Sequence, residues 1–369
     1  MGGGHHPLSD GFTARLGDHP QFPAISGMAD CLNGAKLRRH MNRAVLFLGL
    51  LTAVQGIGAC SASGKNTGFD GEDAGTTPTE PGSSGGLGGD AGIDGTAPSG
   101  APLLYAHTDT TLFQLDPQDI GGAVTTVGDF DCVGKTGPAK TMTDIAVGKD
   151  GKLYGVSEGA AFPLTLQGST VHCDTTWTLP QTRFYGLTVA PENTLGPEEV
   201  LIGADGEGGL YQIDSTSGTP TQVGTLGVDP KTKLPWALSG DIVFVANAGN
   251  PIGFATVRTC PPGKACATVD TLIEVDVKLI KPGKQSTMKS VRGDVVRGGW
   301  CTNTSSPASF GSLFGIVAYK GSVYGFSRAG DVVEIHNGDG SACLVSSDTT
   351  RKYAGAGITT IAPVIAPVN

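Results

Sequence analysis

Residues 315–330 read GIVAYKGSVYGFSRAG, and residues 144–159 read DIAVGKDGKLYGVSEG. Each stretch contains two short runs rich in Val, Ile, Leu and Tyr, joined at Lys320-Gly321 in the first and at Asp150-Gly151 in the second. Such runs are typical of β-strands, and glycine adopts the positive φ of a tight hairpin turn without steric cost. The two stretches therefore predict two copies of one β-hairpin.

The hairpin recurs, and a second pattern follows it. Residues 186–206, GLTVAPENTLGPEEVLIGADG, repeat the hairpin with a longer connection. Residues 112–116, 210–214, 272–276 and 332–336 read LFQLD, LYQID, LIEVD and VVEIH. No segment of helical period separates these strands. We therefore predict an all-β domain built from repeated units of about 40 to 60 residues.

One unit, a hairpin followed by a strand and a final strand such as residues 221–226, resembles one blade of a β-propeller. The strand at Ile358 resembles the first strand of a unit, but no further strands follow it. The unit that begins at 103–105 lacks a first strand of its own. The resemblance therefore implies that the C-terminal strand completes the N-terminal blade and closes the ring. We expect five blades over residues 102–365. Six blades are the alternative, because residues 258–309 could hold an irregular extra one. The five first strands contain Ile145, Leu187, Ile242, Ile316 and Ile358.

Residues 41–60, MNRAVLFLGLLTAVQGIGAC, have the three parts of an export signal: positive charge, an apolar run and small residues. Residues 57–60 resemble the lipobox of bacterial lipoproteins, which implies a signal peptide over 41–59 and a lipid anchor on Cys60. Ser61 in place of an aspartate favours the outer membrane by the same resemblance. Plain secretion and an uncleaved anchor are the alternatives, although the apolar run is shorter than the roughly 20 residues that span a bilayer.

The flanking segments carry little information about function. Residues 1–40 are expected to be a mis-annotated or disordered extension, with Met41 or Met28 as the true start, so the His5-His6 pair is set aside as a metal site. Residues 60–101 are rich in Gly, Ser, Thr, Pro and Asp, which predicts a flexible tether. Their aspartates lack the alternating ligands and closing Glu of a calcium loop.

The chain carries a formal net charge of -9 and has no basic stripe, so we expect no nucleic-acid partner. An even number of cysteines in an exported domain predicts disulfides, with 15 possible connectivities for six cysteines. Cys260 and Cys266 bracket a turn-forming PPGKA loop and are expected to pair. Positions in the propeller-like repeat favour Cys132 with Cys173 and Cys301 with Cys343. Zinc is disfavoured because no CxxC spacing occurs, and no cofactor is expected.

Three patterns invite a catalytic interpretation, and each has a simpler one. Residues 155–159 match the G-x-S-x-G motif of α/β-hydrolases, but no helix is expected to follow, so we predict a turn between strands. Asp116, Asp214 and Asp276 each follow a strand and predict Asx-turns, with ligand contact as the alternative. No catalytic role is assigned to the histidines of the domain, which are His107, His172 and His336.

Two functions stay open. In the first, the domain is a binding or scaffolding module for protein or glycan, with Trp177, Trp236 and Trp300 in loops as stacking surfaces. In the second, it is a hydrolase resembling the five-bladed glycosidases, which place paired carboxylates in a central funnel. The acids that could serve are Asp144, Asp241, Glu158 and Asp294. Carboxylates that converge in a central cavity would favour hydrolysis, and an apolar, plugged centre would favour binding.

Overall fold

The computed structural model describes residues 100–134, 140–179 and 183–364. These residues form 22 strands and two short 3-10 helices, η1 (Asn247–Gly249) and η2 (Val277–Leu279), so the expected all-β class is confirmed. The extension expected at 1–40, the signal peptide expected at 41–59, Cys60 and all but the last two residues of the expected tether (60–101) lie outside the described residues. Among the residues that are described, no helix is long and apolar enough to cross a membrane.

Twenty of the strands form five groups of four, and within each group consecutive strands pair antiparallel. The groups are β22 (Gly355–Ile358), β1 (Leu104–His107), β2 (Thr111–Leu115) and β3 (Val124–Phe130); β4 (Met142–Val147), β5 (Leu153–Ser157), β6 (Ala160–Gln167) and β7 (Thr170–Cys173); β9 (Phe184–Ala190), β10 (Val200–Asp205), β11 (Gly209–Ile213) and β12 (Pro220–Thr225); β13 (Trp236–Val245), β14 (Ile252–Thr259), β15 (Thr271–Val275) and β16 (Met288–Asp294); and β18 (Leu313–Tyr319), β19 (Ser322–Ser327), β20 (Asp331–His336) and β21 (Ser341–Ser347).

Two short strands modify this plan. A parallel pairing of β3 with β7, together with β8 (Trp177–Thr178) on β6, joins the first two groups into one nine-stranded sheet. Strand β17 (Val296–Arg297) pairs parallel with β21 and extends the last group to a five-stranded sheet. The third and fourth groups are separate four-stranded sheets.

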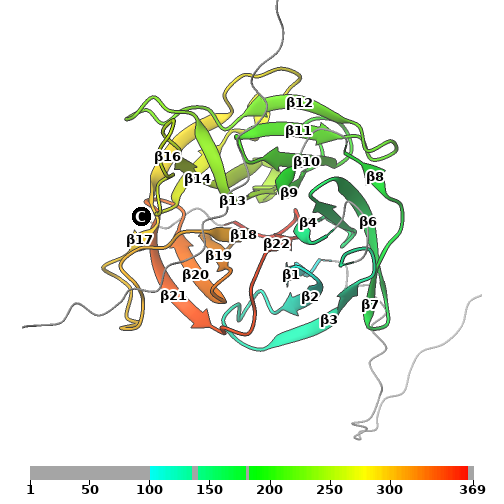
Figure 1. Ribbon diagram of the computed structural model, residues 1–369, viewed down its shortest axis with the longest axis horizontal. Helices are drawn as coiled ribbons and strands as arrows, with labels where there is room; N and C mark the ends of the chain where they lie inside the picture. Colours follow the sequence, from blue (N-terminus) through cyan, green and yellow to red (C-terminus); the bar gives the residue numbers. More distant parts are fainter. Residues whose placement is uncertain (1–99, 135–139, 180–182, 365–369) are drawn as a thin grey trace, which may run out of the picture. The chain divides into compact units, whose positions relative to one another are not determined.

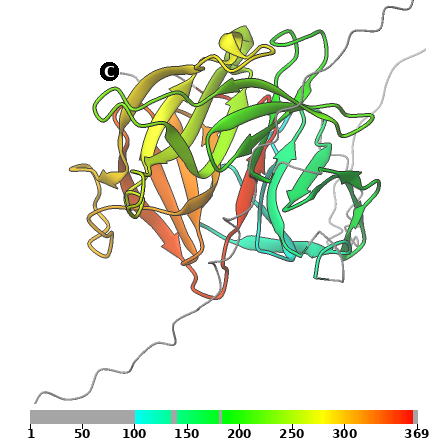
Figure 2. The same cartoon turned by 45° about the horizontal axis from the view of Figure 1, so that its top comes forward.

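The first strands of the five groups meet around a common centre (Figure 1). Strand β4 contacts β9, β9 contacts β13, β13 contacts β18, β18 contacts β22, and β22 contacts β4, which is a closed circuit. Figure 2 shows β22 in red between the orange strands of the last group and the cyan strands of the first. The pairing expected between the strand at Ile358 and the strand at 103–105 is present, with Leu104 opposite Ile358 and His107 opposite Gly355.

Local turn chemistry matches the sequence pattern. Gly151 has φ +82° in the turn between β4 and β5, and Lys320 and Gly321 have φ +46° and +87° in the turn between β18 and β19. Two consecutive positive φ values define the turn whose twist suits a two-residue hairpin. The positive φ values of Gly151 and Gly321 therefore explain why glycine stands in these two hairpin turns.

The apolar core lies between neighbouring groups. Four clusters of buried apolar side chains each draw on at least two groups: the first and second, the second and third, the third and fourth, and the fourth, fifth and first. Each fully buried Leu, Ile, Val or Phe contributes about 1.5–3 kcal/mol relative to exposure. A single group could not bury both of its faces, so the groups stabilise one another.

All six cysteines of the domain form disulfides, in the expected pairs Cys132–Cys173, Cys260–Cys266 and Cys301–Cys343. The first pair joins the segment after β3 to the end of β7, and so reinforces the parallel contact between the first two groups. Three disulfides are typical of a protein in an oxidising, extracytoplasmic compartment.

Candidate functional site

Two of the four acids considered for hydrolysis, Asp144 and Asp241, interact at the centre of the strand circuit. Asp144 lies on β4 and Asp241 on β13, and β9 stands between these strands in the circuit. Side chains from strands that are not neighbours meet only if both point inward. Both residues are 0% exposed.

The oxygens of this acid pair accept backbone N–H groups, two of them from other strands. Leu187 N on β9 donates to Asp144 Oδ2 at 2.5 Å, and Ile316 N on β18 donates to Asp241 Oδ2 at 2.9 Å. Asp241 Oδ1 accepts the N–H of Ile242 at 2.5 Å. A register shift in β13 between Leu238 and Ile242 produces the bulge that contains Asp241. The pair therefore connects four of the five central strands.

Burial sets the ionisation of this pair. Burial raises the pKa of Asp144 well above its ordinary value, and the negative charge of Asp241 raises it further. Burial also raises the pKa of Asp241, to about 7. A carboxylate far from water is costly, and two carboxylates side by side are costlier still, so the pair retains a proton at a pH where exposed aspartates are ionised.

His107, at the end of β1, completes the cluster. Its Nε2 lies 3.9 Å from Asp144 Oδ1, and neither atom has a hydrogen-bond partner among the described residues. Its Nδ1 lies 2.7 Å from the carbonyl oxygen of Thr108, and burial lowers the pKa of the imidazole to about 4. A neutral ring that donates from Nδ1 turns the Nε2 lone pair towards Asp144 Oδ1. Burial thus favours the uncharged form of both the imidazole and the carboxyl group.

Gly355 on β22 makes this approach possible. A Cβ atom at this position would lie 2.3 Å from both Asp144 Oδ1 and His107 Nε2. The fifth central strand therefore touches the cluster through its backbone. Nothing in the spacing of His107 and Asp144 along the chain indicated that they meet, because the pairing of β1 with β22 and the contact of β22 with β4 bring them together.

A third buried acid, Asp270, has a similar structural role. Asp270 accepts the N–H of Leu313 at 3.0 Å and pairs with the guanidinium group of Arg258 at 3.0 Å. Burial raises the pKa of Asp270 above its ordinary value. Its carboxylate links the start of β15 to the start of β18, from neighbouring groups.

The acid pair is unsuited to glycoside hydrolysis. Both glycosidase mechanisms need two carboxyl groups on either side of a bound sugar, about 5 to 9.5 Å apart. Asp144 and Asp241 have no exposed surface, and three of their four oxygens are occupied by backbone donors. The other two candidates are not part of this cluster: Glu158 lies in the turn between β5 and β6, and Asp294, at the end of β16, accepts a hydrogen bond from Thr271 Oγ1.

The G-x-S-x-G motif forms a turn between strands, as predicted. Ser157 ends β5 and is buried, its Oγ lies 3.4 Å from the carbonyl oxygen of Ala160, and β6 begins at that residue. A nucleophile elbow needs a following helix and an exposed hydroxyl. Ser327 ends β19 in the same way.

The repeated aspartates form Asx-turns, as predicted. Asp116 Oδ1 accepts the N–H of Gln118 at 2.8 Å, and Asp276 Oδ1 accepts the N–H of Lys278 at 3.0 Å. Asp214 Oδ1 accepts N–H groups from two following residues, and these hydrogen bonds lower the pKa of its carboxyl group. The side chains close local turns.

The expectation that three tryptophans lie in loops was wrong for two of them. Trp177 begins β8 and is 6% exposed, and Trp236 begins β13 and is 4% exposed. Both indoles pack into apolar clusters. Only Trp300, between β17 and β18, is a loop residue with substantial exposure, at 37%.

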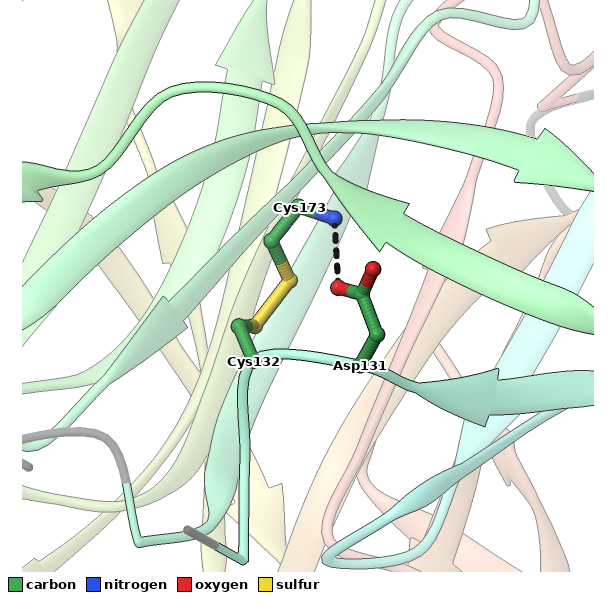
Figure 3. A group of neighbouring side chains, drawn as sticks. All are labelled: Asp131, Cys132 and Cys173. Atoms are coloured by element: carbon green, nitrogen blue, oxygen red, sulfur yellow. Dashed lines mark hydrogen bonds between the residues drawn. A yellow bond between two sulfur atoms is a disulfide. The ribbon is translucent and has the colours of Figure 1, made fainter. Parts of the chain in front are cut away.

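One cluster brings together possible metal donors: a carboxylate oxygen of Asp131 and the sulfurs of Cys132 and Cys173 lie within 4.8 Å of one another (Figure 3). The two sulfurs are joined as a disulfide, so they are not thiolate ligands. Asp131 Oδ1 accepts the N–H of Cys173 at 3.0 Å, and its Oδ2 lies 2.5 Å from His172 Nδ1. The cluster links the segment after β3 to β7.

A shallow polar hollow of about 180 Å³ lies beside the turn between β4 and β5 and the loop between β9 and β10. Its lining includes Lys149, Tyr154 and Glu199. Both carboxylate oxygens of Glu199 accept the backbone N–H of Lys149, at 3.1 and 3.0 Å. This hydrogen bond joins the turn after β4 to the residue before β10.

Comparison with known proteins gives no family. No protein-family model matches the chain, and no curated protein matches it. Among solved structures, it is similar to a protein of Bacteroides fragilis described as a "putative 6-phosphogluconolactonase", with 11% sequence identity over 71% of this chain and 99% of that one and a TM-score of 0.37. A TM-score below 0.5 establishes neither a shared fold nor a shared activity.

Proposed function

We propose that the chain is a lipid-anchored binding module of the bacterial cell envelope, in which a five-bladed β-propeller is displayed on a tether from acylated Cys60. The closed circuit of β4, β9, β13, β18 and β22 and the pairing of β22 with β1 support five blades with ring closure. Between residues 258 and 309, the six-blade alternative has only β15, β16, β17 and the end of β14 to draw on, and these strands belong to the last two groups.

The observation that carries a binding role is the state of the central acids. Asp144 and Asp241 converge, as a hydrolase would require, but they are wholly buried and brace the central strands. The central acids therefore have a structural role, and we propose that partners bind at the surface of the domain. The apolar run before Cys60 and the three disulfides support export. The lipobox-like quartet supports acylation of Cys60, and Ser61 in place of an aspartate supports the outer membrane as the destination.

Two measurements test the proposal. Radiolabelled palmitate should be incorporated into the full chain and not into Cys60→Ala, which should move from the membrane fraction to the soluble fraction. A panel of nitrophenyl glycosides should release no nitrophenol above the rate of a heat-denatured sample. Nitrophenol release that disappears in Asp144→Asn or Asp241→Asn would establish the glycosidase alternative. A wild-type chain that incorporates no palmitate would refute the lipid anchor.

A further inference from the structure

Trp300 is held rigidly although much of it is exposed. Its indole stacks on the imidazole of His336, with ring centroids 4.0 Å apart and planes inclined by 8°. Indole Nε1 donates a hydrogen bond to Ser341 Oγ at 2.9 Å. The next residue, Cys301, is bonded to Cys343 on β21. The ring is therefore fixed from one face, from its edge and through the backbone, while 37% of the residue faces solvent.

Backbone and polar groups surround the nitrogen edge of the indole. The backbone of Gly298 lies against it, because a Cβ atom there would lie 2.3 Å from Trp300 Nε1 and 2.6 Å from Cδ1. Ser341, which accepts the indole N–H, also donates its backbone N–H to Asp339 Oδ1 at 2.9 Å. Hydrogen bonds from Ser341 lower the pKa of Asp339, and the same serine accepts the indole N–H, so Ser341 links the ionised carboxylate to the ring.

A flat apolar ring beside an ionised acceptor matches one class of ligand. The C–H groups on one face of a pyranose sugar form an apolar surface of about the size of an indole, and its hydroxyl groups form a polar rim. An indole already held in place loses no rotamer freedom on binding, which favours affinity for a small ligand. The surface is a single platform, so it suits a sugar unit better than a peptide segment, which needs a groove with several anchor points.

We infer that Trp300 is the stacking platform of a glycan-binding site, with Asp339 accepting a sugar hydroxyl. This inference rests on the proposed binding function and specifies its ligand class and place. The probes are two soluble oligosaccharides, chitotetraose and cellotetraose, added to the ¹⁵N-labelled full chain. The indole N–H signals of the three tryptophans report binding, and Trp300→Phe assigns the signal of Trp300 by its loss.

At least one probe should shift the Trp300 signal in a saturable manner, while the signals of buried Trp177 and Trp236 stay in place as internal controls. Trp300→Ala should weaken binding by calorimetry roughly tenfold or more, which is about 1.4 kcal/mol, and Asp339→Asn should weaken it less. Trp300→Phe keeps an aromatic ring and should retain part of the affinity. Tyr185→Ala, which removes a 40% exposed ring from β9, is the matched control and should leave affinity unchanged.

Each other outcome overturns the inference. If neither probe moves the Trp300 signal, or if Trp300→Ala binds as tightly as the wild type, Trp300 is not the platform. Binding of a purified protein partner that is indifferent to Trp300→Ala would reject this site while leaving the proposed binding function intact. If Trp300→Ala loses the native spectrum, Trp300→Phe is the variant that tests the inference. A folded Trp300→Phe chain that loses all affinity would contradict simple stacking.

Discussion

Replacement of Asp144 by asparagine should remove much of the pH dependence of folding at alkaline pH. In the wild type, the raised pKa values of Asp144 and Asp241 mean that the folded chain holds protons that the unfolded chain releases. Folding is therefore favoured below the unfolded pKa of these groups and weakens as pH rises through their folded pKa. A carboxyl group with a pKa of about 7 in the folded chain and 3.8 in the unfolded chain lowers the free energy of unfolding at alkaline pH by on the order of 4 kcal/mol, relative to acidic pH.

Asparagine keeps the shape of the side chain, accepts the Leu187 N–H and places no charge beside Asp241. Urea unfolding, followed by tryptophan fluorescence, should be measured between about pH 5 and 8.5, because the loss of stability accumulates between the unfolded and the folded pKa and Asp241 titrates at about 7 in the folded chain. In the acidic part of this window His107 contributes with the opposite sign, because its lowered pKa makes the fold lose stability as pH falls from 6.5 towards 4. Wild-type stability should fall by up to about 1.4 kcal/mol per pH unit for each proton released, and Asp144→Asn should show a shallower slope.

The control is Asp116→Asn, since either residue closes an Asx-turn. It should leave both the stability and its slope unchanged. The reasoning is refuted if the wild type shows no decline over this window, or if Asp144→Asn keeps the wild-type slope. A variant that is destabilised equally at every pH would mean that the hydrogen bond geometry, not the charge, dominates at this site.

Two further predictions concern the same framework. Gly355→Ala should destabilise the fold by about 1–3 kcal/mol in urea unfolding, which is the usual cost of overpacking, because its Cβ would lie 2.3 Å from Asp144 and His107. Gly299→Ala is the control and should be neutral, because its Cβ would meet no atom within 4 Å. Double alanine substitution of Cys132 and Cys173 should lower the free energy of unfolding by about 4 kcal/mol, and that of Cys260 and Cys266 by about 2 kcal/mol. Chain entropy gives this difference, because the sequence separations are 41 and 6. Equal losses of stability in thermal unfolding would contradict the entropic account.

The sequence predicted what depends on local chemistry. The hairpins at 144–159 and 315–330 could be recognised because strand alternation and positive-φ glycines are local properties. The Asx-turn at Asp214 could be recognised for the same reason. These features need no knowledge of distant neighbours.

Convergence and exposure could not be predicted in the same way. The meeting of Asp144 and Asp241 depends on a bulge in β13 and on the order of strands around the centre. The position of His107 depends on a strand from the other end of the domain. Trp177 and Trp236 follow turn-like residues, and only the packing of whole groups against one another decides that they are buried.

The pairing of β22 with β1 has a consequence for biogenesis. Leu103 N and Thr359 Oγ1 are hydrogen-bonded although 256 positions separate them, so β1 cannot pair with β22 until the four intervening groups of strands have been synthesised. During synthesis in the N-to-C direction, the edge of β1 that later pairs with β22 stays unpaired for that whole interval. A nonsense mutation shortly before β22 would leave this edge permanently open, and with it the circuit of central strands.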